Sequence, residues 1–178
     1  MSESSLCVAA VRRPKWELAC LGSDSLAMGE FLRLQKEYLC LFRDLCSRKD
    51  WVGLHGLHFD WWQFPIDDGS RCEFNLKSEN DVKVLSSNKV WLDGYLESVR
   101  LVMYAWGWDV DLACFCEDGG FWNKWDIRLA KIIRSLWLFQ QKDYFASVQL
   151  FANKVNDGTG FHYGRICLDE ILHMQLPR

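Results

Sequence analysis

The chain has 178 residues, of which 49% are hydrophobic and 25% charged, and its formal net charge is −3. A chain of this length buries roughly 70% of the surface that its unfolded form exposes, so it needs neither a metal nor disulfides to fold. The composition excludes a disordered chain, and the mixture of acidic and basic residues excludes a uniformly basic nucleic-acid binder. We expect one domain, with residues 1–23 as an N-terminal extension packed on it or loosely attached.

Residues 26–46 carry the clearest helical pattern of the chain. Asp24 or Ser25 is expected to cap the first turn, because a short side-chain oxygen accepts from its free amides. One face is apolar and the opposite face charged, as in a helix that packs on a core; the apolar positions are Phe31, Leu34, Tyr38, Leu41, Phe42 and Leu45.

Residues 51–77 lose this periodicity but are rich in aromatic side chains, with the sequence WVGLHGLHFDWWQFPIDDGSRCEFNLK. An irregular stretch of this length is uncommon inside a compact domain unless it has a function of its own. The alternation in CEFNLK favours a short hairpin at its end. We call residues 51–68 the aromatic segment.

Helical spacing returns at Ser78, which together with Asp81 predicts a capping box. The pattern predicts further helices over residues 89–106, 121–139, 142–155 and about 164–174, with Gly107 ending the first of these. The predicted fold class is therefore all-α, a compact bundle of five or six helices with an irregular aromatic segment.

Ten tryptophans exceed what one small core needs. Those at 91, 122 and 125 lie on predicted helix faces, whereas Trp61, Trp62 and Trp108 lie in aperiodic segments beside glycine, proline or carboxylates. Adjacent side chains diverge on either a helix or a strand, so one of Trp61 and Trp62 should face outward, and likewise one of the pair at 106 and 108. An exposed tryptophan is a common interface anchor. We expect Trp61, Trp62, Phe64 and Trp108 to bind a protein partner.

His55, His58 and Asp60 offer a different hypothesis. Two histidines three residues apart can share a metal, and the carboxylate can be a third ligand or orient a ring. The alternative is structural, with both imidazoles bonded to backbone carbonyls and the segment anchored on the bundle. We favour the anchor, and we expect no cofactor.

A basic stripe is predicted at Lys124, Arg128, Lys131 and Arg134, which share about a third of the helix circumference. It is either the solvated face of an amphipathic helix or a surface that grips phosphates or an acidic partner. The first of these is favoured, and nucleic-acid binding remains the alternative function.

Nothing in the sequence matches a catalytic motif. The acidic residues at 67, 68, 109, 111, 117 and 118 fall in predicted loops, where aspartate is common for turn formation alone. The stretch DGTGFHYG, residues 157–164, follows a helix and lacks the lysine of a phosphate loop, so it is expected to connect two helices, with His162 and Tyr163 near a pocket.

The eight cysteines form no CxxC pair and are expected to be buried free thiols.

The sequence thus predicts a non-enzymatic helical protein that binds a protein partner through its aromatic segment. The apolar run near the N-terminus is too short for a membrane span and precedes its positive charges, so we expect a cytoplasmic protein without a membrane anchor. Its oligomeric state is not predicted.

Overall fold

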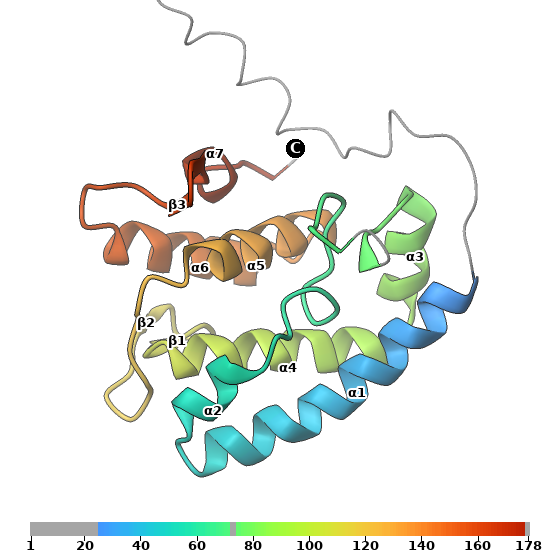
Figure 1. The fold of residues 1–178 in the computed structure, drawn as a ribbon, viewed down its shortest axis with the longest axis horizontal. Coiled ribbons are helices and arrows are strands. Elements are labelled where there is room, and N and C mark those ends of the chain that lie inside the picture. The colour runs from blue at the N-terminus through green and yellow to red at the C-terminus, as the bar shows by residue number, and fades with distance from the viewer. Residues whose placement is uncertain (1–24, 72–73, 177–178) are drawn as a thin grey trace, which may run out of the picture.

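The computed structural model describes residues 25–71 and 74–176 (Figure 1). Within them lie seven helices and two short hairpins. The helices are α1 (Ser25–Ser47), α2 (Trp51–Gly56), α3 (Glu79–Ser87), α4 (Lys89–Ala105), α5 (Asp126–Leu138), α6 (Lys142–Val155) and α7 (Asp169–Leu172). The two-residue strands are β1 (Trp108–Asp109), β2 (Cys114–Phe115), β3 (His162–Tyr163) and β4 (Ile166–Cys167). The predominantly helical fold expected from the sequence is confirmed.

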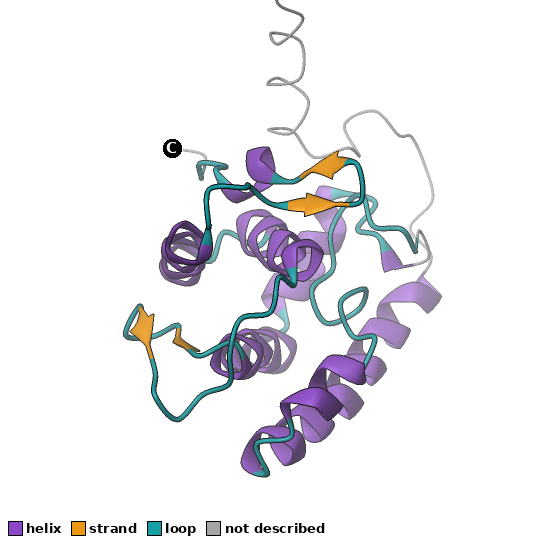
Figure 2. Cartoon of the chain, turned by 60° about the vertical axis from the view of Figure 1, so that its left-hand side comes forward, coloured by secondary structure: helices purple, strands orange, loops and turns teal. Residues whose placement is uncertain are grey.

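The helices form two pairs with the aromatic segment running between them. α1 packs along α4, and α5 packs along α6 (Figure 1). α7 and strand β3 also contact α5, so the C-terminal hairpin β3–β4 lies over that helix on the side away from α4 (Figure 2). Helix α5 therefore has neighbours on most sides, and eleven of its thirteen residues are buried.

Aromatic rings fill the core between these layers. Trp91 stacks on Tyr95 with 5.2 Å between ring centroids, and both rings contact Phe139. Trp106 and Trp108 both pack around Phe151. Such pairs add about 0.5–1.5 kcal/mol each to the free energy of burial, so the unusual tryptophan content serves the core to a large extent.

The start of α5 differs from the sequence prediction. The helix begins at Asp126, whereas the pattern predicted one from residue 121. Lys124 has a φ of +52°, a left-handed backbone that interrupts a helix. The approach of the chain to α4 also matters, since a Cβ at Gly120 would lie 2.1 Å from the carbonyl oxygen of Ala105. Residues 120–125 form an irregular segment that passes close to the end of α4 before α5 begins.

The predicted helix over residues 164–174 is wrong for its first half. Residues 162–167 form the hairpin β3–β4, whose turn contains Gly164 at a φ of +60°, and only α7 is helical. The amide of Leu168 donates to the carbonyl of Phe161, which closes this hairpin. The hairpin predicted in CEFNLK is also absent from its described part, residues 74–77; residues 72 and 73 lie outside the described residues, as do Asp24 and the predicted extension 1–23.

The capping box at the start of α3 is confirmed. The Ser78 hydroxyl accepts from the amide of Asp81 at 3.2 Å, and the Asp81 carboxylate accepts from the amide of Ser78 at 3.0 Å. The same carboxylate accepts from the amide of Lys77 at 2.7 Å.

Replacing Ser78 by alanine is therefore expected to lower the free energy of unfolding by about 1 kcal/mol, because the amide of Asp81 loses its acceptor. Urea denaturation followed by circular dichroism measures the change. Ser78→Thr, which keeps the hydroxyl, should retain most of the stability, and equal losses for both variants would contradict the capping role.

The described cysteines are free thiols, but most are not buried. Among Cys40, Cys46, Cys114, Cys116 and Cys167, only Cys46 is buried, and its Sγ donates to the carbonyl of Leu101. The expectation of buried thiols is wrong for the three exposed ones. Of the described helices, none has the length and apolar character needed to cross a bilayer.

Candidate binding pocket

Three cationic side chains of α5 are buried. Arg128, Lys131 and Arg134 follow one another at successive turns and are 7%, 6% and 7% exposed. The favoured expectation of a solvated basic face is therefore wrong for these three residues. Lys124 alone of the four lies in solvent, before the helix begins, where its Nζ pairs with Asp157 at 2.8 Å. The four residues do not form one continuous surface stripe.

Carboxylates of the loop after α2 face the three cations. The Lys131 ammonium lies 2.5 Å from Oδ2 of Asp60, and Arg134 binds both carboxylate oxygens of Asp67, at 2.9 and 2.5 Å. Oδ1 of Asp60 lies 3.8 Å from Nε of Arg128, too far for a hydrogen bond. Because an unpaired buried charge is strongly destabilising, these contacts fix the loop on α5.

Aromatic rings cover the faces of the same cations. The guanidinium of Arg128 lies 4.8 Å from the ring of Phe59 and 5.1 Å from that of Trp125. The Lys131 ammonium lies 5.3 Å from the Trp61 ring, and the Arg134 guanidinium lies 4.7 Å from Trp137. Cation–π contacts strengthen when water is excluded, so the rings offset part of the cost of burying the charges.

A cavity of about 600 Å³ opens beside this row of cations. Its walls come from the aromatic segment and the residues just after it, from α5, and from the hairpin β3–β4 with α7. Most of the wall is apolar, and the apolar residues include Trp61, Trp125, Ile127, Tyr163, Ile166 and Ile171. The volume lies within the range of ligand pockets in proteins. We call this cavity the α5 pocket.

Two of the predicted interface aromatics belong to the core instead. Phe64 and Trp108 are fully buried, with no exposed surface. Trp108 Nε1 donates to Ser147 Oγ at 3.1 Å, and Trp106 beside it is buried too, so the expectation that one of this pair faces outward is wrong. Phe64 packs edge-on against Phe59.

Trp61 and Trp62 are both half-buried, but only Trp61 lines the α5 pocket. Trp61 Nε1 donates to Ser70 Oγ at 3.0 Å, and the Arg71 guanidinium lies 4.8 Å from its ring. Trp62 packs against Tyr38 and Phe74, toward α1. Of the four aromatics proposed as partner-binding, Trp61 is the one placed at a cavity.

His55, His58 and Asp60 do not converge on one point. His55 is stacked on Trp125 at 4.2 Å between centroids, whereas His58 lies at the wall of the α5 pocket and Asp60 pairs with Lys131. No group of three or more histidine, cysteine, aspartate or glutamate side chains within residues 25–71 and 74–176 is arranged to hold a metal ion.

The environment of His55 favours its neutral form. Burial, followed by the neighbouring positive charge of Arg128, lowers the pKa of His55 from the ordinary 6.5 to about 4. Nη1 of Arg128 lies 3.3 Å from Nδ1 of the ring and donates to the His55 carbonyl at 3.1 Å. A second proton on the imidazole, at Nδ1, would therefore be repelled by the positive charge of Arg128.

Acidification should destabilise the protein through His55. Because the folded state binds this proton with a lowered pKa, the contribution is fully present above pH 6.5 and is lost as the pH falls toward 4. Because solvent reaches part of the ring, we expect the free energy of unfolding to fall by only about 1–2 kcal/mol between pH 7 and pH 4. Urea midpoints measured from pH 7 to 4 test this, and the dependence should flatten in His55→Gln; equal slopes in both proteins would exclude His55 as its source.

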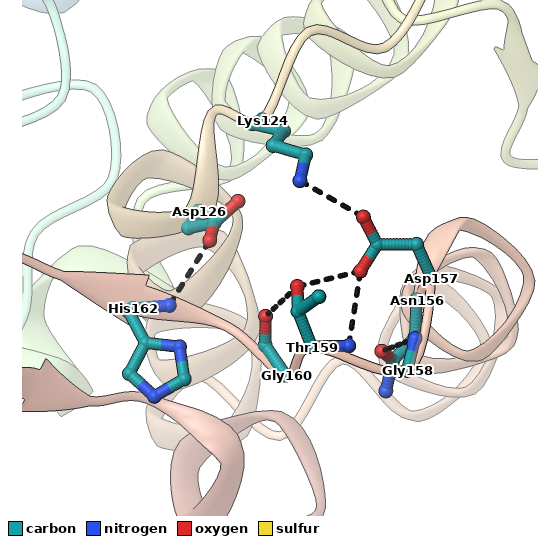
Figure 3. A network of polar contacts seen from close by, with 8 residues as sticks. All are labelled: Lys124, Asp126, Asn156, Asp157, Gly158, Thr159, Gly160 and His162. Atoms are coloured by element: carbon teal, nitrogen blue, oxygen red, sulfur yellow. Dashed lines mark hydrogen bonds and ion pairs between the residues drawn. The ribbon is translucent and has the colours of Figure 1, made fainter.

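A polar network ties the C-terminal hairpin to the start of α5. Lys124 reaches Asp157, the amide of His162 donates to Oδ2 of Asp126 at 3.0 Å, and Asp157 accepts from the amide and hydroxyl of Thr159 (Figure 3). The segment 157–164 thus links α6 to a hairpin, and not two helices as expected. The hairpin is positioned so that Tyr163 and Ile166 form one wall of the α5 pocket.

Two of the other acidic residues, Asp109 and Asp111, have local structural roles. Asp109 accepts from the amides of Asp111 and Leu112, as in a turn, and Asp111 binds Arg100 and the hydroxyl of Tyr144. Neither contributes to the α5 pocket.

Several pocket residues were missed by reasoning from the sequence. The pattern predicts a helix at Ile166, and it predicts that Asp67 is a turn-forming loop carboxylate. The recurrence of a cation every third residue in an otherwise apolar helix is the signal that could have identified the carboxylate, because buried cations require nearby carboxylates.

Comparisons of the chain with protein-family models, curated proteins and solved structures gave no match.

Proposed function

We propose that the protein is a non-enzymatic interaction domain that binds a segment of a protein partner in the α5 pocket. The observation that carries the proposal is the pocket itself, a mostly apolar cavity of about 600 Å³ with Trp61 in its wall. Binding sites are typically of this size and combine apolar walls with a few polar groups.

Exposed apolar side chains on the hairpin extend this surface. Tyr163 is 57% exposed and Ile166 60% exposed, and both line the pocket. Together with Trp61 they give an apolar rim to a cavity that holds buried charges. Aromatic residues in such positions are frequent anchors for partner proteins.

Nucleic-acid binding by the basic stripe is less well supported. A phosphate backbone is gripped by exposed lysine and arginine side chains, each of which releases counterions. Arg128, Lys131 and Arg134 are buried and lie beside carboxylates, which leaves only Lys124 of the four in solvent.

Replacing Trp61 by alanine is expected to abolish partner capture while the chain stays folded, because this ring contributes apolar wall to the pocket. The full chain is immobilised, and proteins captured from extract are quantified by mass spectrometry. The same proteins must be lost again with Ile166→Ala and retained with Val90→Ala, an exposed apolar residue on α4 that is not part of the pocket. Capture that survives both pocket replacements would exclude the proposal.

A further inference from the structure

Among residues 25–71 and 74–176, the buried charges around the α5 pocket do not balance. Three cations, Arg128, Lys131 and Arg134, face two buried carboxylates. Asp67 is engaged by Arg134, and Asp60 is engaged by Lys131. Asp68 and Arg71, which are both exposed, carry opposite charges. One positive charge therefore remains among the buried groups, and its position is Arg128.

Arg128 also has unused hydrogen-bonding capacity. Its Nη1 is directed to His55, but within the described part of the chain Nε and Nη2 have no hydrogen-bond acceptor. Neither atom is among the polar atoms that are fully buried without a partner, so both keep some accessible surface. Since Phe59 and Trp125 cover the guanidinium and Arg128 lines the pocket, this surface opens into the pocket.

The shape of these free groups indicates the ligand. Nε and Nη2 of a guanidinium form a planar pair of donors that matches the two oxygens of a carboxylate. Burial lowers the pKa of Arg128 and outweighs the opposing effect of the Asp60 carboxylate. An anion at this point would supply the missing negative charge.

We infer that the α5 pocket takes a carboxylate attached to an apolar body, with the carboxylate bound by Arg128 and the apolar body lying against Trp61 and Ile166. The inference rests on the proposed function and names the anchor of the partner segment, which is either an acidic side chain or the C-terminal carboxylate. Asp60 leaves these donors available, because its Oδ1 lies 3.8 Å from Nε of Arg128, beyond hydrogen-bond distance, and its Oδ2 is bound by the Lys131 ammonium.

The test uses 2-naphthoate and its neutral isostere 2-naphthamide as probes. Each is titrated into the full chain labelled with ¹⁵N, and the indole signals of Trp61 and Trp125 report binding in the pocket. Because a hydrogen-bonded charge pair strengthens binding appreciably, we expect the carboxylate to bind about tenfold more tightly than the amide.

Variants locate the preference. Arg128→Met should abolish the difference between the two probes, whereas Lys124→Met, which removes an exposed cation just before the same helix, should preserve it. If Arg128→Met fails to fold, the difference in affinity between 2-naphthoate and 2-naphthamide for the unmodified chain still tests whether the pocket prefers a carboxylate. Equal binding of the two probes would overturn the inference but leave the proposed function standing. Binding of neither probe at the pocket tryptophans would overturn both.

Two acidic compounds distinguish a C-terminal carboxylate from a side-chain carboxylate as the bound group. N-acetyl-phenylalanine carries it at the C-terminus, and N-acetyl-glutamyl-phenylalanine amide carries it on a side chain; the glutaminyl peptide amide is the neutral control. Tighter binding of one acidic compound than of the control supports the inference and identifies the source. Acidic and neutral compounds that bind equally would contradict it.

Discussion

Replacing Asp60 by asparagine is expected to lower the free energy of unfolding by about 3–5 kcal/mol, because it leaves buried cations without their carboxylate. The Lys131 ammonium lies 2.5 Å from Asp60, and both side chains are at most one-tenth exposed. Arg128 would lose its nearest negative charge at the same time. Chemical denaturation, monitored by tryptophan fluorescence, measures the loss.

Two controls separate burial of charge from other effects of this substitution. Asp44→Asn removes an exposed carboxylate near the end of α1 that pairs with Arg48 just after the helix, and it should change stability by less than about 0.5 kcal/mol. The double variant Asp60→Asn with Lys131→Met should recover about half of the loss, because one uncompensated cation disappears. A loss for Asp60→Asn as small as that for Asp44→Asn would show that the α5 cations do not depend on Asp60.

Replacing Trp108 by alanine is expected to cost about 3–5 kcal/mol of folding free energy, because a fully buried ring leaves a cavity. The indole packs against Phe115 and Phe151, with ring centroids 5.2 and 5.5 Å away, and its Nε1 bonds to Ser147. The substitution also leaves the Ser147 hydroxyl without this donor. Thermal and urea denaturation both measure the effect.

Trp61→Ala is the matched control, since it removes the same side chain from a half-buried position. We expect this variant to lose about 1–2 kcal/mol of folding free energy, because less of the Trp61 ring is buried. If Trp108→Ala were the milder of the two, Trp108 could not be a core residue, and the assignment of Trp61 to function and of Trp108 to structure would be reversed.

The sequence predicts the helices of this fold better than the segments between them. The boundaries of α1, α4 and α6 agree with the periodicity to within two residues, and the Ser78 capping box is present. These features depend on neighbours three or four residues apart, which a sequence displays directly. The hairpin β3–β4 and the late start of α5 depend on contacts with distant segments, so periodicity could not reveal them.

Components of the candidate pocket can be singled out from the sequence, but their arrangement cannot. Trp61 and the cations of α5 were both singled out, yet as separate surfaces with different partners. Lys131 and Trp61 are 70 residues apart in the chain, and only the fold places the ammonium over the ring. Charged side chains on a helix usually indicate a solvated face, and here the loop carboxylates of Asp60 and Asp67 reverse that expectation.

Site-specific crosslinking tests most directly whether the α5 pocket is the binding site. A photoreactive p-benzoylphenylalanine replaces Tyr163, an aromatic residue at the pocket wall, or Val90, which is 85% exposed on α4 and not part of the pocket. We predict that the captured partner is crosslinked at position 163 and not at position 90, and that Trp61→Ala abolishes the product. Crosslinking at position 90 alone, or at both positions regardless of Trp61, would contradict the account.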